Sequence, residues 1–191
     1  DGDQIEAFSK LVDIYKRGEL VNRNDEEAER LASILISWYQ KTEDGLEWHI
    51  DQGDKTLFIR GNGKMRDYDE NGAPWKEYRR FIYSLNIDYG VESIGECALC
   101  GLSELRSISI PASVNLIDLS SFKECMKLKS IEVFGGNRKY SSESGVLFNN
   151  HNSSLILYPS ARYGRYSVPS GVRVIDEGAF SGCTGLTDVK L

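Results

Sequence analysis

Residues 91–110 read VESIGECALCGLSELRSISI, and this segment returns twice with its apolar positions in register. The second copy, residues 114–133, reads VNLIDLSSFKECMKLKSIEV, and the third, residues 172–191, reads VRVIDEGAFSGCTGLTDVKL. The interval between matched positions of the first two copies is the same throughout. A fixed period of about 23 residues is typical of a solenoid, in which each repeat forms one coil and buries its apolar edge by stacking on its neighbours.

Each copy closes on alternating apolar and polar residues, a pattern that predicts a β-strand with one buried face. Counting back one period from the first copy adds half a unit, which begins at Ile82. The inward positions are then Leu85, Ile87, Ile108, Ile110, Ile131, Val133, Val189 and Leu191. The outward positions, which predict a polar strand face, are Asn86, Ser107, Ser109, Ser130, Glu132, Asp188 and Lys190.

The layout of the unit, "V..I...AF..C..L..I.I", and its joints led by Pro111 and Pro169 closely resemble the bacterial leucine-rich repeats of the BspA-like, Treponema pallidum type. The resemblance covers about residues 48–191. It implies a leucine-rich-repeat solenoid in a surface or secreted bacterial protein. Members of this family are associated with adhesion to host matrix proteins and with coaggregation.

Residues 134–171 lengthen one coil by an insertion between the second and third copies. Short apolar runs predict three strands there, at 145–148, 155–159 and 166–168, in an enlarged repeat with a β-hairpin. Four tyrosines fall in this coil: Tyr140, Tyr158, Tyr163 and Tyr166. Tyrosine suits recognition because it combines a large area with a polar tip, but packing of these rings over the hairpin explains them equally well.

Residues 1–45 have the periodicity of two helices, with Gly18 ending the first and Asn24 as the N-cap of a second that runs to Gly45. Their spacing, with Trp38-Tyr39-Gln40-Lys41 near the end, resembles a Sel1-like (TPR-related) helical hairpin. The alternative is a helical cap that covers the end of the solenoid.

Residues 46–90 are predicted to form a transition and N-terminal capping segment. A strand is expected around Leu57 and Ile59, a turn at 61–63, a short helix at 75–83 and a first repeat strand at 85–87. The sequence therefore predicts an α+β fold with a helical hairpin (1–45), this segment (46–90) and a solenoid (91–191) that contains the insertion 134–171. Because Leu191 falls within a strand, we expect a longer array and an open C-terminal repeat that offers a route to end-to-end self-association.

The composition argues against several partners. The 191 residues carry a net charge of −6 with a pI near 5.1, which gives no general attraction to nucleic acid or to an anionic membrane surface. No apolar run is long enough to predict insertion into a membrane.

The four cysteines are too few for a disulfide scaffold. Cys97 and Cys100 have the C-x-x-C spacing of redox sites and of half a zinc site. The repeat register, however, assigns Ala98 and Leu99 between them to the core and predicts a structural role. Cys125 and Cys183 share one repeat position and are interpreted as small core residues. Reduced cysteines would slightly favour an intracellular or periplasmic scaffold.

Residues 67–72 (DYDENG) match the first six positions of an EF-hand loop. The acidic residue required at the twelfth position is Tyr78, so a polar turn is the preferred interpretation over a calcium site.

We find no catalytic constellation in the sequence and predict a protein-interaction module without enzyme activity, cofactor or metal. Adhesion at the bacterial surface or in the secreted fraction is the first hypothesis, and an intracellular or periplasmic scaffold that docks protein partners is the alternative. The candidate interaction surface comprises Asn86, Ser107, Ser109, Glu132, Tyr140, Tyr158, Tyr163, Tyr166, Asp188 and Lys190.

Overall fold

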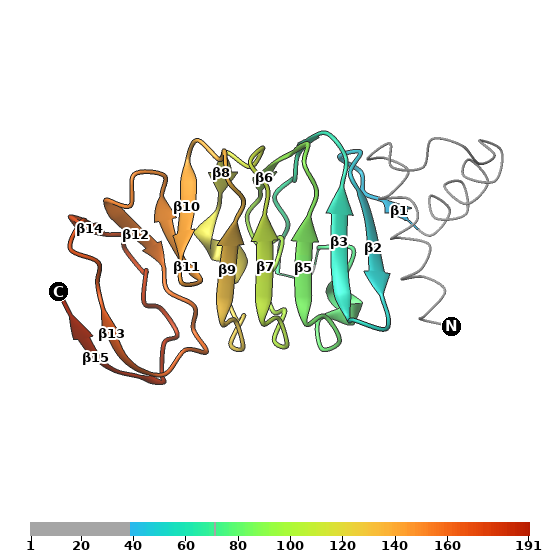
Figure 1. Ribbon diagram of the computed structural model, residues 1–191. Coiled ribbons are helices and arrows are strands. Elements are labelled where there is room, and N and C mark those ends of the chain that lie inside the picture. The colour runs from blue at the N-terminus through green and yellow to red at the C-terminus, as the bar shows by residue number, and fades with distance from the viewer. Residues whose placement is uncertain (1–38, 71) are drawn as a thin grey trace, which may run out of the picture.

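The computed structural model describes residues 39–70 and 72–191, which form a solenoid of short strands (Figure 1). The largest sheet has the order β1-β2-β3-β5-β7-β9, and its strands are β1 Gln40–Lys41, β2 Glu47–Asp51, β3 Thr56–Arg60, β5 Ser84–Ile87, β7 Ser107–Ile110 and β9 Ser130–Val133. A second sheet has the order β4-β6-β8, with β4 Gly63–Lys64, β6 Val91–Ile94 and β8 Leu116–Ile117. Two 3₁₀ turns complete these coils, η1 Lys76–Tyr78 and η2 Leu119–Phe122.

The repeat period appears directly in the pairing of the parallel strands. Leu85 on β5 lies beside Ile108 on β7, and Ile108 lies beside Ile131 on β9. All three side chains are buried. A fully buried aliphatic side chain stabilises a fold by about 1.5–3 kcal/mol, so this column supplies stacking energy at every coil. The predicted leucine-rich solenoid is confirmed for this part of the chain.

An antiparallel hairpin begins the six-stranded sheet. Strand β2 pairs antiparallel with β3, and β3 pairs parallel with β5. Behind them Trp48 packs edge-on against Trp75, with ring centroids 6.1 Å apart. The Trp75 indole Nε1 donates a hydrogen bond of 2.8 Å to the Ala98 carbonyl, which ties the hairpin to the first full repeat.

The predicted α+β class is wrong for the described residues, which form a β-solenoid without an α-helix. The helix predicted to run to Gly45 conflicts with strand β1, which pairs antiparallel with β2. Likewise, the helix predicted at 75–83 is reduced to η1. At Gln40–Lys41, pairing with β2 outweighs the local helix propensity. The rest of the predicted helical hairpin, and with it most of the Sel1-like resemblance, falls on residues 1–38, outside the described residues.

The enlarged coil contains four strands, where the sequence predicted three. They are β10 Tyr140–Glu143, β11 Val146–Asn149, β12 Ser154–Leu157 and β13 Gly164–Ser167. The unpredicted strand is β10, because YSSE has no apolar run. Ser144 and Gly145 join β10 to β11 with φ of +50° and +78°, the conformation of a two-residue hairpin turn whose twist matches the strands.

This hairpin ends the large sheet at β9. The Ile131 amide donates a hydrogen bond of 2.9 Å to the Gly145 carbonyl, so the turn of the hairpin lies directly against β9. Beyond it, β12 pairs with β14 Val174–Ile175 and β13 pairs with β15 Leu186–Lys190. A small separate core around Phe148 and Tyr158 fills this region. The last coil therefore follows the stack but does not extend its largest sheet (Figure 1).

Strands β14 and β15 each form one edge of their sheets. Leu191 is predicted to point into the coil, but it is 86% exposed because no strand of the described chain lies against it. Among the described residues, no helix has the length and apolar character needed to cross a bilayer.

Candidate interaction surface

The outward side of the large sheet carries two rows of side chains set by the parallel register. We call these two rows the sheet face. The first row consists of Thr56, Ser84, Ser107 and Ser130, and the second consists of Phe58, Asn86, Ser109 and Glu132. The hydroxyls of Ser84 and Ser107 lie 3.0 Å apart and share a hydrogen bond between adjacent coils. The result is a surface of mostly hydroxyl-bearing side chains, with one amide at Asn86, supported by the buried column.

Four of the predicted surface residues meet on the sheet face. Asn86 pairs with Ser109, Ser109 pairs with Glu132, and Ser107 lies in the adjoining row. Asp188 and Lys190 lie on β15, in the separate two-stranded sheet. The structure therefore does not bring these two residues onto the same sheet, because the inserted hairpin separates the last coil from β9.

The four tyrosines of the enlarged coil do not form one exposed cluster. Tyr158 is buried, and Tyr166 packs against it with ring centroids 4.6 Å apart. The Tyr140 hydroxyl accepts a hydrogen bond of 3.0 Å from the Ile117 amide, and burial of this phenol raises its pKa. Only Tyr163 of the four is largely exposed, at 85%. Packing is thus the role of three of these rings in the structure.

A row of basic residues around a tyrosine lies where the strands of the large sheet begin. We call Lys55, Tyr83, Arg106 and Lys129 the basic rim. Consecutive backbone hydrogen bonds of 2.7–2.8 Å join these four residues across the coils. The Lys55 ammonium lies 4.4 Å from the centre of the Tyr83 ring, and the Arg106 guanidinium lies 4.1 Å from it.

The sequence contained a signal for this rim that outward-facing positions alone do not reveal. Each member is the residue immediately before a strand of the large sheet, and Tyr83, Arg106 and Lys129 recur at the repeat period. Each rim residue precedes the alternating apolar and polar residues of its strand. An analysis of those alternating residues alone therefore does not include it.

Glu104, an acidic group close to Arg106 and Lys55, is paired with another cation. The Lys127 ammonium donates to both oxygens of Glu104, at 2.7 and 2.8 Å. This hydrogen bonding lowers the pKa of Glu104, and the charges of Lys127, Arg106 and Lys55 add to the effect. The Glu104 carboxylate is therefore paired first with Lys127, which lies outside the rim.

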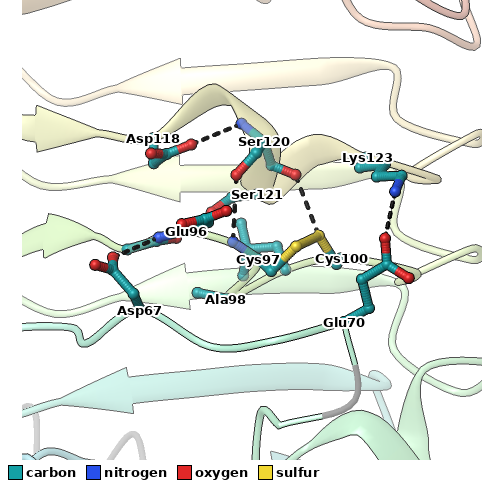
Figure 2. Close-up of a disulfide and its surroundings, with 12 residues drawn as sticks. Asp67, Glu70, Glu96, Cys97, Ala98, Cys100, Asp118, Ser120, Ser121 and Lys123 are labelled. Atoms are coloured by element: carbon teal, nitrogen blue, oxygen red, sulfur yellow. Dashed lines mark hydrogen bonds and ion pairs between the residues drawn. A yellow bond between two sulfur atoms is a disulfide. The ribbon is translucent and has the colours of Figure 1, made fainter.

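Cys97 and Cys100 are joined by a disulfide on the turn that follows β6 (Figure 2). The prediction that Ala98 and Leu99 between them lie in the core is confirmed, since both are fully buried. The assumption of reduced cysteines is wrong for this pair. The C-x-x-C turn brings the two Cα atoms to 4.7 Å, which is within the distance that a disulfide can bridge. Burial of the two residues between them does not prevent the bond.

Cys125 and Cys183 are free thiols at one repeat position. The buried Cys125 thiol donates to the Leu99 carbonyl of the preceding coil at 3.3 Å, and Cys183 does the same toward Tyr158 at 3.5 Å. Burial raises the pKa of Cys125 to about 12. Such a thiol is unreactive and links one coil to the next.

Thiol titration should distinguish the two kinds of cysteine. We expect the native chain to show no fast-reacting thiol at residue 97 or 100, and the unfolded, unreduced chain to show two thiols, those of Cys125 and Cys183. Prior reduction should raise this number to four. Four thiols in the unfolded chain without reduction would contradict the disulfide.

The acidic turn before η1 distributes its carboxylates to different partners. Asp67 accepts a hydrogen bond of 2.8 Å from the Glu96 amide, and Glu70 pairs with Lys123 (Figure 2). Residue 71 lies outside the described residues. Within the described part of the chain, no three His, Cys, Asp or Glu side chains are grouped to hold a metal ion.

Comparison with known protein families assigns the chain to one of them. The model of the BspA type leucine rich repeat region matches residues 78–163 and 158–191 with six copies. The chain therefore belongs to the BspA-type leucine-rich repeat family, and membership of this family implies a protein-interaction role. A search of curated proteins found no match.

Solved structures similar to this chain include three bacterial proteins, two of them described as leucine-rich. A leucine-rich repeat protein from Eubacterium ventriosum is 21% identical over 80% of this chain and 59% of its own, with a TM-score of 0.42. The pneumococcal vaccine antigen PcpA is 15% identical over 80% of this chain and 70% of its own, at a TM-score of 0.43. A leucine-rich cell surface protein from Faecalibacterium prausnitzii is 15% identical over 80% of this chain and 76% of its own, with a TM-score of 0.35. The chain thus spans less than two thirds of the first of these proteins.

Proposed function

We propose that this chain is a non-catalytic protein-binding module of a bacterial surface or secreted protein that acts in adhesion. The observation that carries the proposal is the sheet face. Its side chains are held in register by a buried column, so a partner would meet a preorganised surface with little conformational entropy left to lose. Hydroxyl and amide groups at its centre, at Ser107, Ser109 and Asn86, can both donate and accept hydrogen bonds.

The Cys97–Cys100 disulfide supports the surface or secreted location. Disulfides persist in oxidising surroundings and are rare in the reducing cytosol. The disulfide argues against the intracellular form of the scaffold only, because disulfides also persist in the bacterial periplasm.

Two buried titratable groups serve packing. Burial raises the pKa of Tyr68 and of Cys125 to about 12, and both side chains lie in the hydrophobic core. At neutral pH each stays protonated, so neither serves as a base or a nucleophile.

Binding to purified matrix proteins tests the proposal. The chain, immobilised in oxidised form, is expected to bind at least one of fibronectin, laminin and type I collagen at micromolar or lower concentration, and not serum albumin. Heat-denatured chain is the matched control, because it has the same composition without the sheet face. Failure of the folded chain to bind any of the three matrix proteins would contradict adhesion.

A further inference from the structure

The end of the solenoid where the strands begin has a charge opposite to that of the whole chain. The four segments that lead into β3, β5, β7 and β9 are residues 52–55, 76–83, 101–106 and 123–129. Because these strands are parallel, their leading segments gather at one end of the stack (Figure 1). Their basic residues are Lys55, Lys76, Arg79, Arg80, Arg106, Lys123, Lys127 and Lys129, and their acidic residues are Asp54, Glu77, Glu104 and Glu124.

Within this end, the basic rim presents its charges in a line. Adjacent strands lie about 4.8 Å apart, so the backbone positions of Lys55 and Arg106 are about 10 Å apart and Arg106 and Lys129 about 5 Å. Tyr83 lies between the first two and contacts both cations through its ring. This arrangement holds two long, otherwise mobile side chains above one coil.

Hydroxyl-bearing residues follow these charges one position along the chain, so their backbones lie next to the rim at the start of each strand. Thr56, Ser84, Ser107 and Ser130 each directly follow a rim residue, and they form the first row of the sheet face. A line of cations next to a line of hydroxyls is complementary to a linear chain that carries both anionic groups and hydroxyl groups at short, regular intervals. Sulfated polysaccharides have this chemistry.

An acidic protein segment fits the rim less well. Protein partners are anchored chiefly by aromatic and aliphatic side chains seated in pockets. The aromatic ring of the rim, Tyr83, already has cations against it.

We propose that the basic rim binds a sulfated linear polysaccharide, with Lys55, Arg106 and Lys129 contacting its sulfates and the adjoining hydroxyl row contacting its sugar hydroxyls. Tyr83 is a positioning residue that holds Lys55 and Arg106. The site shares the first row with the sheet face, but its cations lie outside that face, so this proposal does not rest on protein binding.

The test uses heparin as the probe and the whole chain. We expect the affinity to fall with salt, with a slope of log affinity against log salt of magnitude about 2, because three cations each release a counterion. The double variant Arg106→Ser/Lys129→Ser should bind about tenfold more weakly, with a slope magnitude below 1. The matched control is Arg138→Ser/Lys139→Ser, which removes the same two charges from exposed residues beyond β9 and should leave heparin affinity unchanged.

Two comparisons complete the experiment. Chemically desulfated heparin and polyglutamate should each bind at least tenfold more weakly than heparin. Equal loss of heparin affinity in both double variants would overturn the proposal, since it would reflect net charge alone. Polyglutamate binding as tightly as heparin would also overturn it, in favour of an acidic protein segment. Binding of the Arg106→Ser/Lys129→Ser variant to matrix proteins tests the protein-binding role of the sheet face separately from heparin binding.

Discussion

Replacing Ile108 by alanine should lower the free energy of unfolding by about 3–4 kcal/mol. Ile108 is buried in the middle of the column, with Leu85 on one side and Ile131 on the other. The substitution removes transfer free energy and leaves a cavity that the neighbouring coils cannot close without shifting. Urea unfolding followed by circular dichroism measures the change as a lower midpoint at unchanged slope.

The adjacent outward residue provides the control for this effect. Ser109→Ala changes a side chain on the same strand that points to solvent, and it should alter the free energy of unfolding by less than about 0.5 kcal/mol. Ile108→Val should lie between the two, at about 1 kcal/mol. Equal destabilisation by the Ile108 and Ser109 alanine variants would show that the column is not the source of stability.

The second large effect is expected from Gly90→Ala, at about 3 kcal/mol or more. Gly90 has a φ of +114°, and a Cβ there would lie 2.4 Å from the Gly61 carbonyl oxygen of the preceding coil. The change therefore combines a backbone conformation that alanine rarely adopts with a contact that only movement of the backbone can relieve. The melting temperature is the simplest measure.

Gly63→Ala separates these two contributions. Gly63 has a nearly identical φ of +119°, but a Cβ at this position would have no neighbouring atom within 4 Å. Its replacement should lower stability by about 1 kcal/mol through backbone strain alone. If both variants are equally destabilised, the close approach of the two coils contributes nothing.

Much of the solenoid follows from the sequence, because its determinants repeat. Ile108, for example, is assigned to the interior by its own strand and again by the matching positions of the neighbouring units, Leu85 and Ile131. A position that is apolar in several repeats is buried between stacked coils, which a single stretch of sequence does not show. For this reason Ala98 and Leu99 were placed correctly in the core.

What the sequence missed lies where the repeat is interrupted or bounded. Strand β10 and the relocation of β15 depend on the inserted hairpin, whose contact with β9 is long-range. The disulfide depends on the turn geometry between Cys97 and Cys100, for which the repeat offers no parallel. The helix expected to reach Gly45 gave way to β1 because pairing with β2 is a tertiary contact that local periodicity does not report.

Only part of the candidate surface could be predicted from the sequence, because the rest depends on contacts between coils. Strand alternation places Asn86, Ser109 and Glu132 on one face. The basic rim precedes the strands, and Tyr83 connects Lys55 to Arg106 only after the coils stack. For Tyr158, packing and recognition were equally open from the sequence, because composition does not distinguish a buried ring from an exposed one, and the structure buries it.

The protein-binding role of the sheet face is tested most directly by surface plasmon resonance of Ser109→Arg on the matrix protein that the native chain binds. A long cation at the centre of the face should weaken binding at least tenfold, whereas Tyr163→Ala, at the exposed tyrosine of the enlarged coil, should leave the affinity within twofold. Both variants should unfold at the native midpoint. Unchanged affinity of Ser109→Arg, with loss of binding in Tyr163→Ala, would contradict the account and place the partner on the enlarged coil.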